Sequence, residues 1–213
     1  MSFQSLHREL QKLTKKVPSL ILQTTTSITD IQNSLQILKG LCSRLEILQR
    51  DSGSLGVLTL FFNVISALKA DHLRQMELIV SLCSNCVDDI GTAVTTLNEL
   101  CTDAFQRYSS HSQVLSVEQL SQPSAPLPAI SLILEWFDWL YRAYALQASC
   151  IGAIIGDIKL FTIGFSEGAI IGSDIQTKFA TWNSRIMECR VDEVRVNFII
   201  ASWSARIPLE VTI

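Results

Sequence analysis

Apolar residues recur every three or four positions along the first fifty residues of the chain. This spacing places them on one side of a helix. Pro18 interrupts the pattern because proline does not fit a helix interior, so we expect a break or kink near Val17 and a main helix from about Ser19 to Arg50. The stripe consists of Leu6, Leu10, Leu13, Val17, Leu20, Ile28, Ile31, Leu35, Leu38, Cys42, Leu45 and Leu48.

A second stripe predicts a helix from about His72 to Tyr108. At a rise of about 1.5 Å per residue this helix is roughly 55 Å long, so it needs a partner of similar length. The first helix is the obvious partner, packed antiparallel at a shallow coiled-coil angle. Val87 and Leu97 are expected in the core. The stripe consists of Leu73, Met76, Val80, Cys83, Val87, Ile90, Val94, Leu97, Cys101, Ala104 and Tyr108.

The segment between the two stripes, Val57–Ala70, is also expected to be helical. Its Phe61–Ile65 run leaves a strand open as the alternative. Asp71 has the side chain of a helix N-cap, so we expect the second long helix to start there.

A proline-rich connector, Ser109–Pro128, follows the second stripe, because Pro123, Pro126 and Pro128 cannot continue a helix. The next helix is expected from Ala129 to about Ile151. Beyond Cys150 the chain is rich in glycine and contains the string GAIIG twice, and only Thr181–Trp203 shows a weak helical pattern.

These patterns predict an all-α fold. A long antiparallel helical hairpin or bundle is followed, after the proline-rich loop, by a fourth helix. We expect residues 1–150 to form the helical bundle domain and residues 151–213 a glycine-rich, divergent C-terminal region without assigned structure.

Composition narrows the class of protein. Of 213 residues, 48% are apolar and 17% charged, which is the balance of a folded chain. The net charge of −3 argues against a general phosphate-backbone binder, and we interpret the basic cluster Lys12, Lys15 and Lys16 as a solvated helix face. The sequence therefore predicts no direct nucleic-acid site.

The N-terminal stretch Leu6–Lys16 is amphipathic and lacks the continuous apolar run of a signal peptide. We expect a cytoplasmic protein, with the nucleus as a second location, and cysteines that remain thiols. Cys83 and Cys86 form a C-x-x-C, but neither a second such pair nor paired histidines complete a zinc set.

A formal G-x-S-x-G motif, Gly164–Gly168, follows the β-like run Leu160–Ile163. The histidine of an α/β-hydrolase triad comes after its serine, whereas the three histidines here (His7, His72 and His111) all precede Ser166. No phosphate-binding loop is present either. We expect a non-enzymatic protein with no catalytic, cofactor-binding or metal-binding residues.

The segment Cys150–Gly172 is long enough to span a bilayer, and Gly164, Gly168 and Gly172 have the spacing of packed transmembrane helices. However, Asp157 and Lys159 lie inside it, and each costs about 2.5–3.5 kcal/mol near the centre of a membrane helix. A membrane contact is therefore not expected.

The aromatic side chains of the fourth helix are a candidate binding feature. Trp136 and Trp139 share one side of the helix, and Phe137 and Tyr141 share another. A single neighbouring helix cannot cover both sides, which leaves aromatic area for a partner, although complete burial in the core is the alternative.

Several short motifs of the chain resemble a known family. They are Ala104–Tyr108, Ser116–Leu120, Gln122–Ala125 and Leu134–Trp136, with Arg142 and Tyr144 extending the match. Residues 5 to 145 are similar to the AIRIM-like family of ribosome maturation factors, small helical proteins that interact with an AFG-two-type AAA ATPase. After Trp136 the sequence departs from the family pattern, with Trp139 and Tyr141 where charged residues are usual.

The resemblance implies an adaptor subunit that assists an AAA ATPase complex on pre-60S ribosomal particles in the cytoplasm. A coiled-coil scaffold subunit of another cytosolic complex is the alternative. We place the partner-binding surface on the Gln122–Pro128 loop and the Trp136 helix. Its candidate residues are Gln122, Pro123, Ser124, Glu135, Trp136, Trp139, Arg142 and Tyr144.

Overall fold

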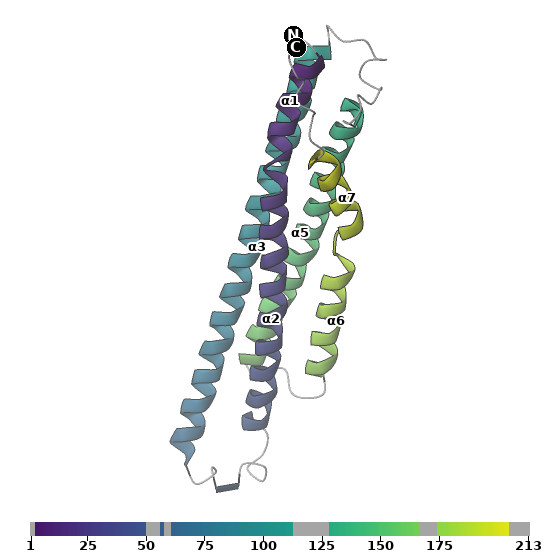
Figure 1. Cartoon of the computed structure of the whole chain (residues 1–213). Helices are drawn as coiled ribbons and strands as arrows, with labels where there is room; N and C mark the ends of the chain where they lie inside the picture. Colours follow the sequence, from purple (N-terminus) through teal and green to yellow (C-terminus); the bar gives the residue numbers. More distant parts are fainter. Residues whose placement is uncertain (1–2, 50–55, 58–60, 113–127, 167–173, 205–213) are drawn as a thin grey trace. The chain divides into compact units, whose positions relative to one another are not determined.

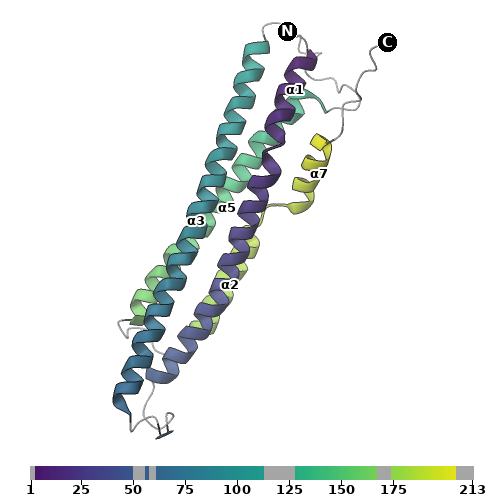
Figure 2. The same cartoon turned by 60° about the vertical axis from the view of Figure 1, so that its left-hand side comes forward.

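The structure is a computed structural model, and it describes residues 3–49, 56–57, 61–112, 128–166 and 174–204. Within these ranges the chain forms helices and no strand, which confirms the all-α fold (Figures 1 and 2). The helices are α1 (Phe3–Thr14), α2 (Val17–Gln49), α3 (Phe62–Ser112), α5 (Ile130–Ser166), α6 (Asp174–Glu188) and α7 (Glu193–Ser204).

The break predicted near Val17 is confirmed. Helix α1 ends at Thr14, and the Lys16 amide donates to the Leu13 carbonyl in a turn. Pro18 then lies in the first turn of α2, where its missing N–H costs no helical hydrogen bond.

The predicted start of the second long helix at Asp71 is wrong. Helix α3 begins at Phe62 and runs unbroken through Asp71, so the strand at Phe61–Ile65 is excluded as well. The Asp71 carboxylate accepts a hydrogen bond from the Gln75 side chain at 2.6 Å rather than from a backbone amide. Asp71 therefore forms an i,i+4 side-chain pair with Gln75 on an exposed helix face and does not act as an N-cap.

Helix α5 is also longer than predicted, because it continues past Ile151 to Ser166. The run Leu160–Ile163, despite its β-like composition, lies inside it, and Ser166 is its last residue. Three glycines, Gly152, Gly156 and Gly164, weaken this helix, but buried residues at helical spacing outweigh them: Ile151, Ile154, Ile155, Ile158, Phe161 and Phe165.

The C-terminal part of the described chain contains two helices, where the sequence pattern indicated only a weak helix over Thr181–Trp203. Helix α7 begins after Asp192, whose carboxylate accepts from the Val194 and Arg195 amides at 3.0 and 3.1 Å. This is N-cap geometry, and Glu193 in the first turn adds a favourable charge.

The chain folds into two compact units that share its long helices. Unit 1 comprises residues 1–24, 90–148 and 190–213, and unit 2 comprises residues 25–89 and 149–189. Each unit therefore draws on segments far apart in the sequence. The division expected from the sequence, at residue 150, stays a prediction.

In unit 2, α2 and α3 pack antiparallel. The Ser34 side chain hydrogen-bonds Cys83, and Asp30, one turn earlier on α2, faces Cys86 later on α3. Helix α6 packs on α5 through Phe179 and Trp182, whose rings lie 6.1 and 5.4 Å from the Phe161 ring.

In unit 1, α1 and α3 lie side by side (Figure 2), and α7 packs against α5 through the Phe198 and Trp136 rings (Figure 1). The core contains residues of both predicted stripes, with Leu6, Leu10 and Leu13 from α1 and Leu97, Cys101 and Ala104 from α3. Leu97 is thus a core residue as expected, whereas Val87, in unit 2, is only half-buried.

By length and composition alone, α3 over Asn63–His111 and α5 over Ile130–Phe165 could each cross a membrane. Core helices of soluble proteins meet the same criterion. In the segment considered as a span, Asp157 is paired with Arg185 of α6 at 3.1 Å.

Candidate partner-binding surface

The family-like motif Ala104–Tyr108 lies on α3 and divides between core and surface. Ala104 is buried, and Tyr108 packs against the core of unit 1. Phe105 keeps 43% of its surface exposed, and Gln106 is exposed beside it. A large aromatic side chain left in solvent at this position is available to a partner.

Phe105 and Gln106 line an open groove of about 420 Å³ between α3 and α5, which we call the α3–α5 groove. Its floor includes Cys101, and burial raises the pKa of this thiol above its ordinary value. Tyr141 and Asp138 form the α5 side. The complete lining is Asn98, Cys101, Thr102, Phe105, Gln106, Ser109, Asp138 and Tyr141.

One wall of the groove is fixed by an ion pair on α5. The Asp138 carboxylate accepts from Arg142 Nε at 2.9 Å, and the Arg142 side chain is 75% exposed. Glu135, one turn before, is also exposed. Two of the predicted partner-binding residues, Glu135 and Arg142, are therefore accessible next to the groove.

Trp136, by contrast, is a core residue with 6% exposure. Its ring lies 6.1 Å from both Phe198 and Trp203 of α7, and Phe137 stacks on Trp203 at 5.1 Å. Trp136 therefore agrees with the alternative in which these aromatic side chains belong to the core, whereas the partner-binding interpretation counted only one neighbouring helix. Helix α7 is an additional neighbour, and it covers this side.

Trp139 and Tyr144 occupy intermediate and buried positions. The Arg195 guanidinium of α7 lies over the Trp139 ring at 4.2 Å, a cation–π contact that covers part of this half-buried side chain. Tyr144 is buried, and burial, with a smaller effect of Glu193, raises its pKa to about 12. A phenol held neutral in the core contributes packing rather than an exposed contact.

The predicted loop residues Gln122, Pro123 and Ser124 lie outside the described residues. Pro128, at the end of that loop, is half-buried, and its carbonyl lies 3.0 Å from His7 Nε2 of α1. This contact ties the start of α5 to α1.

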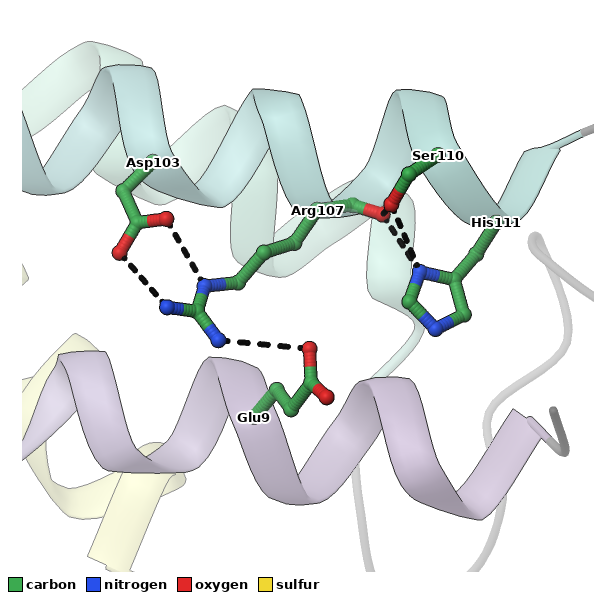
Figure 3. Close-up of polar contacts among 5 residues, drawn as sticks. All are labelled: Glu9, Asp103, Arg107, Ser110 and His111. Atoms are coloured by element: carbon green, nitrogen blue, oxygen red, sulfur yellow. Dashed lines mark hydrogen bonds and ion pairs between the residues drawn. The ribbon is translucent and has the colours of Figure 1, made fainter.

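Arg107, the fourth residue of the motif, connects α3 to α1 (Figure 3). Its guanidinium donates to both oxygens of Asp103, from Nε at 2.9 Å and from Nη2 at 3.0 Å. It also reaches Glu9 Oε2 on α1 at 3.3 Å. Arginine is charged at its ordinary pKa, and the Asp103 hydrogen bonds raise the Arg107 pKa further, so this side chain is a permanently charged link between the two helices.

The six cysteines are free thiols, of which Cys42, Cys83 and Cys101 are buried. Burial raises the pKa of Cys42 to about 12 and that of Cys83 to about 11, so both remain protonated at neutral pH. Among the residues that the structure describes, no group of three or more histidine, cysteine or acidic side chains is placed to hold a metal ion.

The α3–α5 groove was not predicted from the sequence. Tyr141 was assigned to a helix face shared with Phe137, and not to a surface that it forms together with Asp138. A usable signal existed in Phe105, an aromatic residue that falls outside the apolar stripe of Cys101, Ala104 and Tyr108.

A search of curated proteins finds no significant match to the chain. The sequence pattern of one protein family, described as ribosome biogenesis protein C1orf109-like, matches residues 4–201. The match includes α5, α6 and most of α7, beyond the region in which the motifs were recognised. The chain belongs to the ribosome biogenesis protein C1orf109-like family.

Proposed function

We propose that the chain is a non-enzymatic helical adaptor subunit that assists an AAA ATPase in the cytoplasmic maturation of the large (60S) ribosomal subunit. Membership in a ribosome biogenesis protein family supports a role in ribosome maturation. The ATPase partner and the large subunit come from the resemblance of the motifs. We propose the cytoplasm as the main location and the nucleus as a second one.

The observation that carries the adaptor role is the position of Phe105 and Gln106. These two residues of the family-like motif are not needed for the core, and they line an open groove instead. A partially exposed aromatic side chain in a groove with a polar rim has the character of an interface anchor. Glu135 and Arg142 next to the groove supply charges that can select and orient a partner.

Affinity purification of the tagged full chain, followed by mass spectrometry, tests this proposal. Wild-type chain should recover an AAA ATPase and large-subunit precursors. Phe105→Ala should reduce that recovery about tenfold, because truncating an interface anchor typically costs on the order of 1–2 kcal/mol or more.

Leu78→Ala is the matched control, since Leu78 is 61% exposed on the same helix but outside the groove. Circular dichroism should show native helical content for both variants. Equal recovery by both variants would place the ATPase contact elsewhere. Recovery of a cytoskeletal or trafficking assembly without ribosomal precursors would favour the scaffold alternative.

A further inference from the structure

Helix α1 and the turn after it carry a concentrated positive charge. Arg8 and Lys12 are one helical turn apart, and Lys15 and Lys16 follow in the turn that joins α1 to α2. All four side chains are exposed. The opposite side of α1 is apolar and lies in the core of unit 1 through Leu6, Leu10 and Leu13. We call the four side chains the α1 basic face.

The neighbouring acidic residue is withdrawn from this face. Glu9 is the acidic residue of α1, and its carboxylate points to α3, where Arg107 Nη1 lies 3.3 Å away (Figure 3). None of the four cations forms an ion pair within the described part of the chain. The Arg107 link therefore leaves the α1 basic face without a counter-charge of its own.

We infer that the α1 basic face binds the phosphate backbone of RNA. Closely spaced, exposed and unpaired cations are the feature that recognises a polyanion, since each phosphate contact releases a condensed counterion. This inference revises the prediction, made from the net charge of −3, that the chain has no direct nucleic-acid site. The net charge argues against binding over the whole surface, but it does not exclude a local site, because at about 0.1 M salt charges more than about 10 Å apart are largely screened. Binding to the phosphate backbone therefore depends on the local charge of the α1 basic face and not on the net charge of the chain.

A membrane surface fits this face less well than RNA. A helix that lies in a bilayer interface inserts its apolar side between the lipids. The apolar side of α1 is already occupied by the core of unit 1. Family membership adds a reason to choose RNA, since ribosome precursors are rich in it. The inference goes beyond the adaptor role and does not depend on the ATPase.

The test uses the full chain and fluorescein-labelled polyuridine RNA, with binding followed by fluorescence anisotropy at several salt concentrations. The test variant carries Arg8→Gln, Lys12→Gln, Lys15→Gln and Lys16→Gln. The control variant removes the same charge from unit 2 with Lys39→Gln, Arg44→Gln, Arg74→Gln and Lys159→Gln. Circular dichroism checks that both variants keep their helical content.

We expect the α1 variant to bind about tenfold more weakly at low salt than the native chain and the control, or weaker still. Its plot of log affinity against log salt should be shallower by about 3, because each of the four phosphates that it no longer neutralises contributes about 0.7 to the slope. The inference is overturned if the native chain does not bind RNA, or if the control loses as much affinity as the α1 variant. Binding to equimolar phosphatidylcholine–phosphatidylserine vesicles in place of RNA would also overturn it.

Discussion

At the scale of single residues, Arg107 shows how a family-like residue can act through structure rather than through contact with a partner. The ion pairs of Arg107 involve side chains that are between 28 and 40% exposed, so each contributes only about 0.2–1 kcal/mol to stability. Their larger effect is on the orientation of the Glu9 side chain. They hold Glu9 on the α3 side of α1 and so separate the charges of that helix.

The two tryptophans of α5 differ in burial, and their variants should differ in stability. Trp136→Ala should lower the free energy of unfolding by about 3–5 kcal/mol, because it empties a site packed against Phe198 and Trp203. Trp139→Ala removes a half-buried ring and one cation–π contact, so we expect a loss of about 1 kcal/mol.

Urea unfolding followed by circular dichroism measures both losses. Equal midpoints for Trp136→Ala and the native chain would contradict the burial of Trp136. Only Trp139→Ala is suited to a test of partner binding, because the native fold survives it.

At the scale of elements, several helices contain glycines that packing does not require. A methyl group at Gly40, Gly91 or Gly156 would meet no atom within 4 Å outside its own helix turn. Since glycine costs about 0.5–1 kcal/mol relative to alanine in a helix interior, each Gly→Ala change should stabilise the chain by up to that amount.

Thermal unfolding of the three single variants tests this expectation. Leu97→Ala is the contrasting variant on α3, because Leu97 is 1% exposed and its truncation should cost about 2–5 kcal/mol. A lower melting temperature for all three glycine variants would show that these positions are closely packed.

The helices were predictable from the sequence where apolar residues recur at helical spacing. Nearly all of the first stripe, from Leu6 to Leu45, is buried as predicted. The extent of α5 was missed because Gly152 and Gly156 were given more weight than the isoleucines between them. The start of α3 was missed because an aspartate has the same side chain at an N-cap and on an exposed helix face.

The candidate surface was less predictable than the helices. Exposure of Phe105 and burial of Trp136 depend on which helices meet, and local spacing does not contain that information. Helix α7 covers Trp136 from more than sixty positions further along the chain. Of the predicted partner-binding residues that the structure describes, Glu135 and Arg142 are the exposed ones, and both were named because they belong to the family-like motifs.

At the scale of the whole molecule, the composition of the two units makes a fragment informative. A chain that ends at residue 150 lacks residues 190–213 of unit 1, which contain α7. It also lacks nearly all of residues 149–189, the second segment of unit 2. We expect this fragment to unfold without a cooperative transition and to bind the apolar dye ANS, because Trp136, Phe137 and the α2–α3 stripes lose their cover.

The full chain, with a sigmoidal urea transition and no dye binding, is the reference. A cooperative transition in the fragment would instead support the division of the chain at residue 150 that the sequence predicts.

Because the segments of unit 1 are far apart in the sequence, they are synthesised at different times. Its first segment ends at Thr24 and its last begins at Arg190, a separation of 166 residues (190 − 24). At about 5–20 residues per second, translation takes roughly 10–30 s to cover that distance. During this interval Leu6, Leu10 and Leu13 have been synthesised, but α7, which completes their core, has not. A chaperone that binds nascent chains can therefore bind these apolar residues of α1 for longer than it can bind segments made later.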